Sequence, residues 1–345
     1  MRLLSLVAVA AALTSTAAGA GQRLPRLPRP LFVVRQPMLA LAASGANAAV
    51  ATGCDVRVAN LLRHPRRPVR VPQFGPCAQG GFAAVDALYV GRSTLVAEED
   101  DAESPHGEDF TLWSGPLPRG PLRSLDDEEW GWRDDDMPSA YGCEATVVQG
   151  GGVLAVVDGP NTLGIDGVVP CAGVSPTKIR LLGAPRPTLV VPGSWSILAS
   201  DGRRLVLERL DPSGSPTTAL RMVAFDGTQL PLPRFNAKAV GSAFRGWLVG
   251  RTLLLQTSRG ISGPGWTIRG AADGVVGEGR LIYRQNHVVR VRRLRDGVDR
   301  ALVRLPSANA LLAGGSFGLA VATGIAQKTY VYRLSWRTID RTLTR

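Results

Sequence analysis

Short apolar segments recur along the chain and resemble one another. Each is rich in small or β-branched residues and Leu, and several are followed by a segment in which apolar and polar residues alternate. The seven apolar segments are AAVAT (48–52), TLVAE (94–98), LAVVD (154–158), RLVLE (204–208), LLLQT (253–257), LIYRQ (281–285) and LAVAT (319–323). Clear alternation follows in DVRVANL (55–61), TALRMVAFD (218–226), HVVRVRRL (287–294) and TYVYRL (329–334). A period of two places one side of a strand on a core and the other in water, so the pattern predicts repeated groups of β-strands.

The groups contain further strands and turns. An apolar stretch precedes some of the marked segments, as in SWSILAS (194–200), and a short strand near a Pro follows in RPVRVP (67–72) and RALVRLP (300–306). Asp-Gly pairs at 201–202, 226–227, 273–274 and 296–297 predict tight hairpins. Outside the N-terminal segment, no stretch shows the i, i+3, i+4 apolar spacing of an amphipathic helix.

The spacing of the groups predicts their arrangement. The marked segments lie, on average, close to the roughly 40–45 residues of a four-stranded propeller blade. A single four-stranded sheet cannot bury both of its faces, whereas blades packed around an axis can, and ring closure leaves few exposed edges. We therefore predict an all-β fold, a single β-propeller of about seven four-stranded blades over residues 38–345. One short interval, between 253 and 281, also leaves six or eight blades open.

One stretch carries a resemblance to known families. SWSILASDGRRLVLERLDPSG (194–214) resembles a blade of the TolB-type and WD-repeat-like propellers, in which a strand ends in Asp-Gly, a basic turn follows and an apolar strand continues. The chain lacks the Trp-Asp dipeptides and Gly-His pairs of typical WD repeats. The resemblance implies a fold and no particular activity, because propellers include enzymes, receptors and scaffolds.

The N-terminus has the layout of a signal peptide. One basic residue, Arg2, precedes an apolar run from Leu3 to Leu13, and small residues follow up to Ala20. We predict a signal peptide over 1–20, cleaved after Ala20, and a secreted or cell-envelope location with no membrane-spanning segment afterwards. An uncleaved signal anchor is the alternative, although the apolar run is shorter than the ~20 residues that span a bilayer. Residues 21–37 form a Pro- and Arg-rich lead with a candidate closing strand.

The chain has four cysteines, and an even number in an exported protein predicts disulfides. Three connectivities are open. The pairs Cys54–Cys77 and Cys143–Cys171 close the shortest loops, so we predict these two. Zinc binding is the alternative, but no C-x-x-C pair is present.

Charge is distributed unevenly along the chain. The formal net charge is +12, whereas residues 98–136 hold 14 acidic residues against three arginines. So many carboxylates repel one another on a compact blade, so we predict acidic loop insertions at 98–108 and 124–138. The segments TLVAE and DFTLWSG (109–115) should remain as strands of one blade. Carboxylates at this density could hold calcium, whose ligands are oxygens, but no ordered calcium-loop motif occurs, and we predict neither a metal nor a cofactor.

Aromatic residues within or between these acidic stretches are the candidate binding residues. They are Trp113, Trp130 and Trp132, together with Asp134, Asp135 and Asp136. Exposed aromatics among charges are typical of a contact surface, because they provide contact area at a low entropy cost. The alternative is that these aromatics fill the space between blades.

Other motifs do not predict a catalytic or metal site. GGSFG (314–318) matches a nucleophile elbow, but a strand follows it and no His comes later, so a glycine-rich turn is predicted. His64, His106 and His287 lie in three different groups of strands and are interpreted as surface residues. The arginines of 287–305 have no aromatics between them, so we predict no nucleic-acid binding. Adhesion to anionic envelope polymers is a minor alternative to a solvent-facing strand.

None of these motifs provides a catalytic constellation. We therefore predict an exported, monomeric, non-catalytic binding or scaffolding module whose partner is an unknown protein or envelope polymer. The alternative is a propeller enzyme of the hydrolase, lactonase or lyase type. Such an enzyme should place carboxylates, histidines or tyrosines on the innermost strands at one end of the central channel. The strands expected there are mostly Ala, Val, Leu, Gly and Thr, which favours the binding module.

Overall fold

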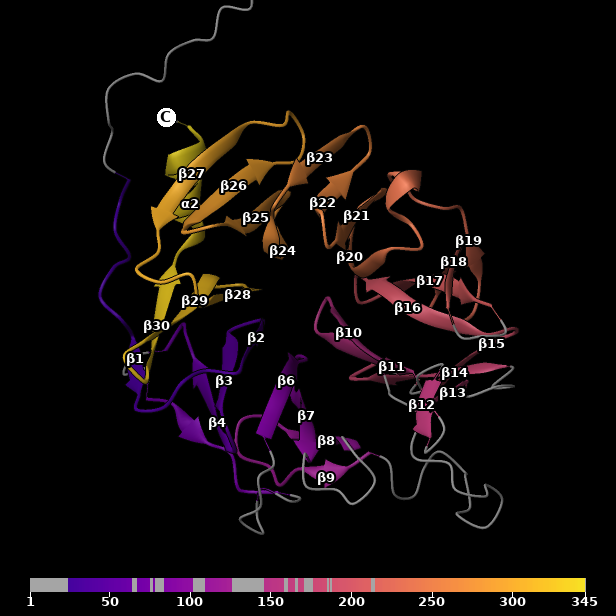
Figure 1. The fold of residues 1–345 in the computed structure, drawn as a ribbon, viewed down its shortest axis with the longest axis horizontal. Coiled ribbons are helices and arrows are strands. Elements are labelled where there is room, and N and C mark those ends of the chain that lie inside the picture. The colour runs from indigo at the N-terminus through magenta and orange to yellow at the C-terminus, as the bar shows by residue number, and fades with distance from the viewer. Residues whose placement is uncertain are drawn as a thin grey trace, which may run out of the picture.

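The fold is a ring of seven four-stranded antiparallel sheets, or blades (Figure 1). It was obtained as a computed structural model. The structure describes residues 24–63, 67–74, 77, 84–101, 109–125, 146–157, 161–164, 167–170, 176–184, 186, 188–211 and 215–344. The predicted propeller is confirmed, and the number of blades is seven.

Each blade runs from a first to a fourth strand, with neighbours hydrogen-bonded in that order. The first strands are β2 (Ala40–Ser44), β6 (Ala84–Val90), β10 (Thr146–Gly150), β16 (Trp195–Ser200), β20 (Ala243–Val249), β24 (Ala272–Gly277) and β28 (Ala310–Gly315). The second strands are β3 (Asn47–Thr52), β7 (Thr94–Asp101), β11 (Val153–Val157), β17 (Arg204–Leu210), β21 (Thr252–Thr257), β25 (Arg280–Gln285) and β29 (Gly318–Ile325). The third strands are β4 (Asp55–Asn60), β8 (Asp109–Pro116), β14 (Thr177–Leu182), β18 (Pro216–Ala224), β22 (Gly260–Gly263), β26 (Val288–Arg293) and β30 (Lys328–Leu334). The fourth strands are β5 (Val69–Arg70), β9 (Arg123–Ser124), β15 (Thr188–Val191), β19 (Gln229–Leu230), β23 (Trp266–Arg269), β27 (Asp299–Arg304) and β1 (Phe32–Val34).

All seven apolar segments found in the sequence fall on second strands. These strands lie inside a blade that has a neighbouring blade on each side, so their side chains are covered on both faces, and every residue of β11 is buried. Continuous apolar sequence follows from that environment. The short interval in the sequence arises because β22 and β23 in blade 5 have four residues each and only two residues connect β23 to β24.

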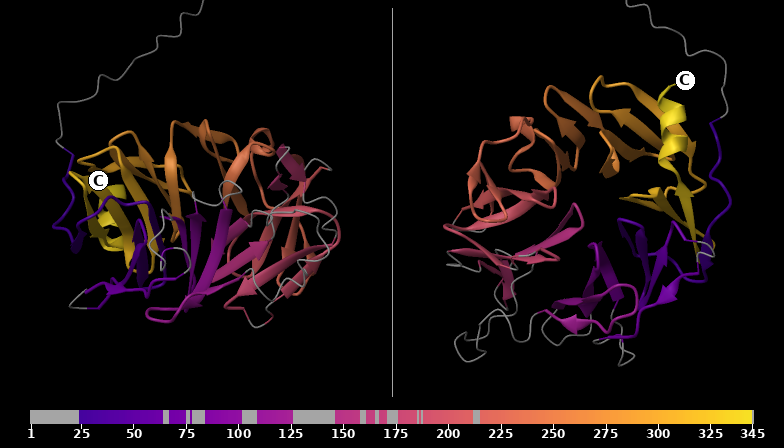
Figure 2. Two further views of the ribbon diagram at one scale, coloured as in Figure 1. Left: turned by 60° about the horizontal axis from the view of Figure 1, so that its bottom comes forward. Right: turned by 180° about the vertical axis from the view of Figure 1, so that it is seen from behind.

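The last blade is completed by the N-terminal part of the chain. β1 pairs antiparallel with β30, with Phe32 opposite Val331 and Val34 opposite Thr329. The Thr329 hydroxyl also donates to the carbonyl of Gln36 at 2.7 Å. Figure 2 shows the indigo N-terminal segment beside the yellow C-terminal strands. Segments nearly 300 residues apart therefore share one sheet, which closes the ring.

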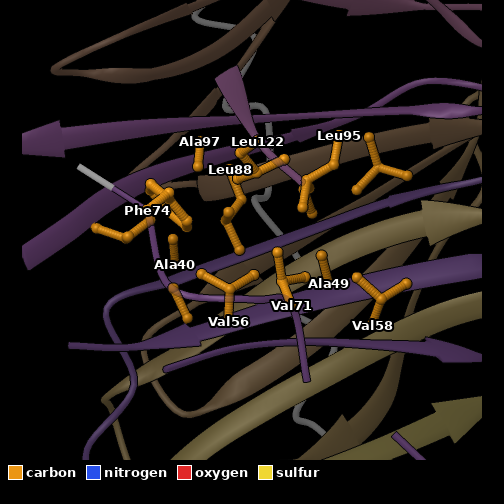
Figure 3. Close-up of a cluster of buried hydrophobic side chains, with 14 of the residues drawn as sticks. Ala40, Ala49, Val56, Val58, Val71, Phe74, Leu88, Leu95, Ala97 and Leu122 are labelled. Carbon is orange, nitrogen blue, oxygen red and sulfur yellow. The ribbon is translucent and has the colours of Figure 1, made fainter. Parts of the chain in front are cut away.

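The core consists of apolar layers between neighbouring blades. Each of the seven interfaces has its own cluster of buried side chains, and the cluster between blades 1 and 2 includes Val56, Phe74, Leu88 and Leu95 (Figure 3). Because each blade buries both faces against its neighbours, no single blade has a complete core of its own.

Two structural features differ from the sequence predictions. The chain contains a helix, α2 (Trp336–Leu343), whose Ser335 side chain accepts a hydrogen bond from the amide of Thr338. Ile339 and Leu343 are the buried residues of this helix, so an i, i+4 apolar spacing is present in the sequence but covers a single pair. The Asp-Gly pair at 273–274 is wrong as a hairpin: it lies at a register shift inside β24, with Asp273 at a φ of 49°. A side chain at Gly274 would meet the Trp247 ring.

Two smaller elements lie outside the blades. β12 (Asn161–Gly164) and β13 (Gly167–Pro170) form a hairpin between the second and third strands of blade 3, and η2 (Ala237–Ala239) precedes blade 5. In the parts of the chain that the structure describes, no helix combines the length and the apolar composition needed to cross a membrane.

A buried carboxylate links blades 4 and 5. Glu208 is buried, and its Oε1 accepts a hydrogen bond of 2.8 Å from the backbone amide of Gly241. Burial raises the pKa of Glu208, and the hydrogen bond from Gly241 partly opposes that shift. The folded state therefore binds this proton more tightly than the unfolded state does.

The substitution Glu208→Gln should make stability less dependent on pH. A carboxyl group with a raised pKa in the folded state loses its contribution to stability as pH rises from the unfolded pKa through the folded pKa. Gln keeps an acceptor for Gly241 but does not ionise, so the gain in unfolding free energy over wild type should be larger at about pH 7 than at about pH 4. Urea unfolding at both values measures this.

Glu208→Ala is the matched control. It leaves the Gly241 amide without its acceptor and should cost about 1–3 kcal/mol. An equal effect of Glu208→Gln at both pH values would contradict the assignment of Glu208 as a destabilising charge.

Candidate functional site: an arginine-rich turn face

One end of the ring is built from turns of all seven blades. In an antiparallel blade, the turns after the first and third strands lie at the same end. Neighbouring turns contact each other there: the amide of Ser316 donates to the carbonyl of Gly45 at 2.7 Å, and that of Arg92 to the carbonyl of Gly152 at 2.7 Å. Arg204 Nη2 donates to the carbonyl of Gly250 at 2.9 Å. We call this end the turn face.

Arginines gather on the turn face. Those in or next to its turns, with those of α2, are Arg63, Arg67, Arg92, Arg119, Arg123, Arg186, Arg203, Arg204, Arg234, Arg251, Arg280, Arg293, Arg295, Arg337 and Arg341. The carboxylates in the same described positions are Asp201, Asp226, Glu278, Asp296, Asp299 and Asp340. A surface with this excess of positive charge attracts anionic partners.

A repeated dipeptide places several of these arginines. Gly-Arg occurs in the turn between the first and second strands of four blades, at 91–92, 202–203, 250–251 and 279–280. The glycines of the last three turns have positive φ values of 86°, 60° and 73°, which a residue with a side chain rarely adopts. The Arg that follows is the first residue after the bend, so each of these blades presents an Arg at the same end.

Some of these arginines are neutralised and others are not. Arg204 pairs with Asp201 at 2.6 Å and Arg293 with Asp296 at 3.0 Å. Arg92, Arg203, Arg234 and Arg251 are exposed, and among the described residues no carboxylate lies within ion-pair distance of them. Their guanidinium groups are available to a ligand.

Three cavities open on the turn face. The largest, about 700 Å³, lies between blades 5 and 6 and is bounded by α2; we call it the blade 5–6 cavity. A second, of about 270 Å³, lies between blades 4 and 5 and shares Arg234 with the first. A third, also of about 270 Å³, is lined by Arg92 and Arg203. The free arginines and the cavities therefore occupy the same surface.

The helix α2 is fixed against the largest cavity by local packing. The Trp336 indole donates to the carbonyl of Gly315 at 3.1 Å, and a side chain at Gly277 would lie 2.6 Å from the Trp336 ring. Glycine at 277 is therefore what lets the ring approach β24. Asp340 of α2 forms an ion pair with Arg280 at the cavity rim.

Acidic residues lie at the opposite end of the ring. β7 and β8 meet there with Asp101 opposite Asp109, and the residues between them, 102–108, lie outside the described residues. The strands predicted for TLVAE and DFTLWSG are both present in blade 2.

The predicted contact residues are only partly within the described chain. Trp130, Trp132, Asp134, Asp135 and Asp136 lie outside the described residues, as do His64 and His106. Trp113 is half-buried and packs against Phe74, with ring centroids 5.7 Å apart, in the cluster between blades 1 and 2. Much of its ring is therefore occupied by interblade packing. His287 is exposed in the turn between β25 and β26, at the end opposite the turn face.

The cysteine pairing is confirmed for one of the two predicted pairs. Cys54 and Cys77 form a disulfide, with Cα atoms 5.5 Å apart. Glu99 lies beside them and accepts a hydrogen bond from the Cys77 amide at 2.8 Å, but the two sulfur atoms bind each other and not a metal. Cys143 and Cys171 lie outside the described residues, so their pairing stays a prediction.

The innermost strands are the first strands of the blades, and β2, β10, β24 and β28 are composed mainly of Ala, Val, Leu and Gly, as expected for the channel. First strands of neighbouring blades, such as β2 with β6 and β16 with β20, contact each other around the axis (Figure 1). They carry Tyr89, Arg245 and Asp273. Arg245 is exposed, yet loss of hydration lowers its pKa while Asp273 and Tyr89 oppose the shift. The described first strands contain no His, so they offer no Ser-His or Cys-His pair.

Sequence comparisons place the chain in no known family. No family model matches it, and no curated protein matches its sequence. Among solved structures, it is similar to the AfRom2 CNH domain, with 11% identity and a TM-score of 0.47 over 90% of this chain and 99% of that one. It is also similar to human WBSCR16, with 10% identity and a TM-score of 0.48 over 93% and 94% of the two chains. A third is PorZ, a surface component of the type-IX secretion system of Porphyromonas gingivalis, with 11% identity and a TM-score of 0.45 over 90% of this chain and 39% of that one. At these identities and TM-scores, structural similarity does not indicate a shared function.

Proposed function

We propose that the protein is an exported, non-catalytic binding module whose turn face binds an anionic partner. The proposal rests on four arginines, Arg92, Arg203, Arg234 and Arg251, which have no carboxylate partner among the described residues and cluster around three cavities on one end of the ring. Four blades contribute a Gly-Arg turn to this end, so the charge is a product of the repeat rather than of one loop. Export is supported by the signal-peptide pattern and by the Cys54–Cys77 disulfide, which persists in oxidising compartments.

Binding is favoured over catalysis by the kind of groups that gather there. Guanidinium groups hold carboxylates or phosphates well, but they do not act as nucleophiles or bases at neutral pH. Nucleic acid is a less suitable ligand, because single strands are bound by stacking on exposed aromatic rings. The Trp266 ring at the largest cavity is already covered by Arg292, which lies 4.7 Å from its centroid.

Binding to poly-L-glutamate tests the proposal. Arg234→Glu/Arg251→Glu reverses two unpaired charges and should weaken binding about tenfold, since each exposed charge contributes up to about 1 kcal/mol. Wild-type affinity should also fall steeply as salt rises, because exposed charges are screened. Isothermal titration calorimetry at low and moderate salt measures both effects.

The matched control is Arg259→Glu/Lys328→Glu. Both residues are exposed in or beside turns at the opposite end of the ring, and the change in net charge is the same. If this variant loses as much affinity as the first, overall charge and not the turn face explains binding, and the proposal is wrong.

A further inference from the structure

We propose that the blade 5–6 cavity is the anchor site for an acidic polypeptide segment, which inserts one aliphatic or aromatic side chain between blades 5 and 6. The inference rests on the proposed function, since it names the class of partner for the same face. It follows from three properties of the cavity: an apolar floor, an arginine rim and continuity with a second cavity.

The floor of the cavity is apolar. Val249 and Leu254 from blade 5, Leu294 from blade 6 and Leu343 from α2 line it. Its volume of about 700 Å³ lies within the range of sites that enclose a compact ligand group. An apolar lining contributes favourably to the binding free energy only when a ligand covers it with apolar surface of its own. The ligand must therefore carry an apolar group.

The rim of the cavity is basic, and ion pairs hold some of its side chains in place. Four arginines line it, Arg234, Arg280, Arg293 and Arg295, against the carboxylates of Glu278 and Asp340. Arg280 pairs with both carboxylates, so these three side chains together carry a net charge of −1, and the positive charge of the rim comes from Arg234, Arg293 and Arg295. Among the described residues, no carboxylate lies within ion-pair distance of Arg234. The side chain of Arg295 is 77% exposed, and its Nε lies 3.5 Å from a carboxylate oxygen of Asp296. The ligand is therefore expected to carry acidic groups beside its apolar group.

The site is elongated rather than compact. Arg234 also lines the neighbouring cavity between blades 4 and 5, together with Pro231, Leu232 and Pro233. Leu232 is 47% exposed there, so an apolar surface continues beyond the first cavity. A chain that crosses from one cavity to the other can place an apolar side chain in the first and acidic side chains along Arg234 and Arg251. An extended peptide has this form, because its side chains project at regular intervals.

Other anionic polymers fit less well. A sulfated or carboxylated polysaccharide has anionic groups but no large apolar group for Leu254, Leu294 and Leu343. A nucleic acid has bases that need an open aromatic face, and Arg292 covers Trp266. These polymers remain as outcomes of the test.

The experiment compares two synthetic peptides, an oligoglutamate with one central Leu and the same peptide with Ala in its place. Wild type should bind the Leu peptide about tenfold more tightly, because the cavity buries the larger side chain. Val249→Trp fills the cavity without changing charge and should abolish that difference while leaving the affinity for the Ala peptide unchanged. Leu294→Gln, which makes the floor polar, should do the same and serves if Val249→Trp does not fold. Val190→Trp, at an exposed position on β15 outside the cavity, is the control.

The outcomes distinguish failure of anion binding at the turn face from failure of the anchor site in the blade 5–6 cavity. If neither peptide binds wild type, the proposed function itself fails. If both bind equally, the turn face binds anions but the anchor site is wrong. If a sulfated dextran of similar charge binds more tightly than the Leu peptide, and Val249→Trp weakens it, the partner is a polysaccharide and the peptide assignment is overturned.

Discussion

The double substitution Phe32→Asp/Val34→Asp is expected to lower the unfolding free energy by about 3–6 kcal/mol, since burying each such side chain contributes about 1.5–3 kcal/mol. Val34 is buried, and Phe32 packs in the clusters that join blade 7 to blade 1. Carboxylates at both positions would detach β1 from β30 and leave blade 7 with three strands. Urea unfolding gives the free energy, and hydrogen exchange should show lost protection in β30 first.

Val33→Asp is the matched control from the same strand. Val33 lies between the two changed residues, but its side chain points away from the core and is 43% exposed. It should therefore change stability little. If Val33→Asp destabilises the protein as much as the double variant does, the damage comes from added charge and not from the opened ring.

The second large effect is expected from Cys54→Ser/Cys77→Ser, which should cost about 3 kcal/mol, the value typical of a loop of this length. The disulfide spans 23 residues and connects the β3–β4 turn of blade 1 to the segment leading into blade 2. The Cys77 amide also donates to the buried Glu99 of blade 2, so both ends of this link are attached to different blades. Chemical unfolding of the oxidised wild type and of the double variant measures the loss.

Cys143→Ser/Cys171→Ser is the companion variant, and peptide mapping without reducing agent tests the pairing predicted for it. Reduction should destabilise wild type by the contributions of both pairs, and it should destabilise Cys54→Ser/Cys77→Ser only by the contribution of the second pair. An unchanged unfolding midpoint for Cys54→Ser/Cys77→Ser would contradict a stabilising role for the first disulfide.

Much of the fold was predictable because local sequence and burial agree. Second strands have neighbouring blades on both sides, and so they read as continuous apolar runs such as LAVVD. Third strands are less fully covered, and TYVYRL and HVVRVRRL show the alternation expected of them. The Asp-Gly hairpins at 201–202, 226–227 and 296–297 form as predicted, since their turn chemistry is local.

The candidate site was not predicted, although part of its signal is in the sequence. The Gly-Arg pairs are visible at 91–92, 202–203, 250–251 and 279–280 once the strands on both sides are known. Without the strand order, nothing indicates that these arginines lie at one end of a ring. Arg234 is not part of a Gly-Arg pair in a turn, so no sequence motif identifies it. It lies at the site because it forms an isolated β-bridge with Thr252.

The sequence by itself determined that this chain forms repeated strands, how many apolar units it has, and that Cys54 and Cys77 are close enough in the chain to pair. Those features depend on the periodicity of single strands and on the length of short loops, which involve only residues close together in the sequence. Only the tertiary structure decided that Phe32–Val34 closes the ring, that first strands line the channel, that Asp273-Gly274 is a bulge against Trp247 and that α2 bounds a cavity. Each of these depends on contacts between residues far apart in sequence, and the free energy of such contacts is gained only when neighbouring blades are in place.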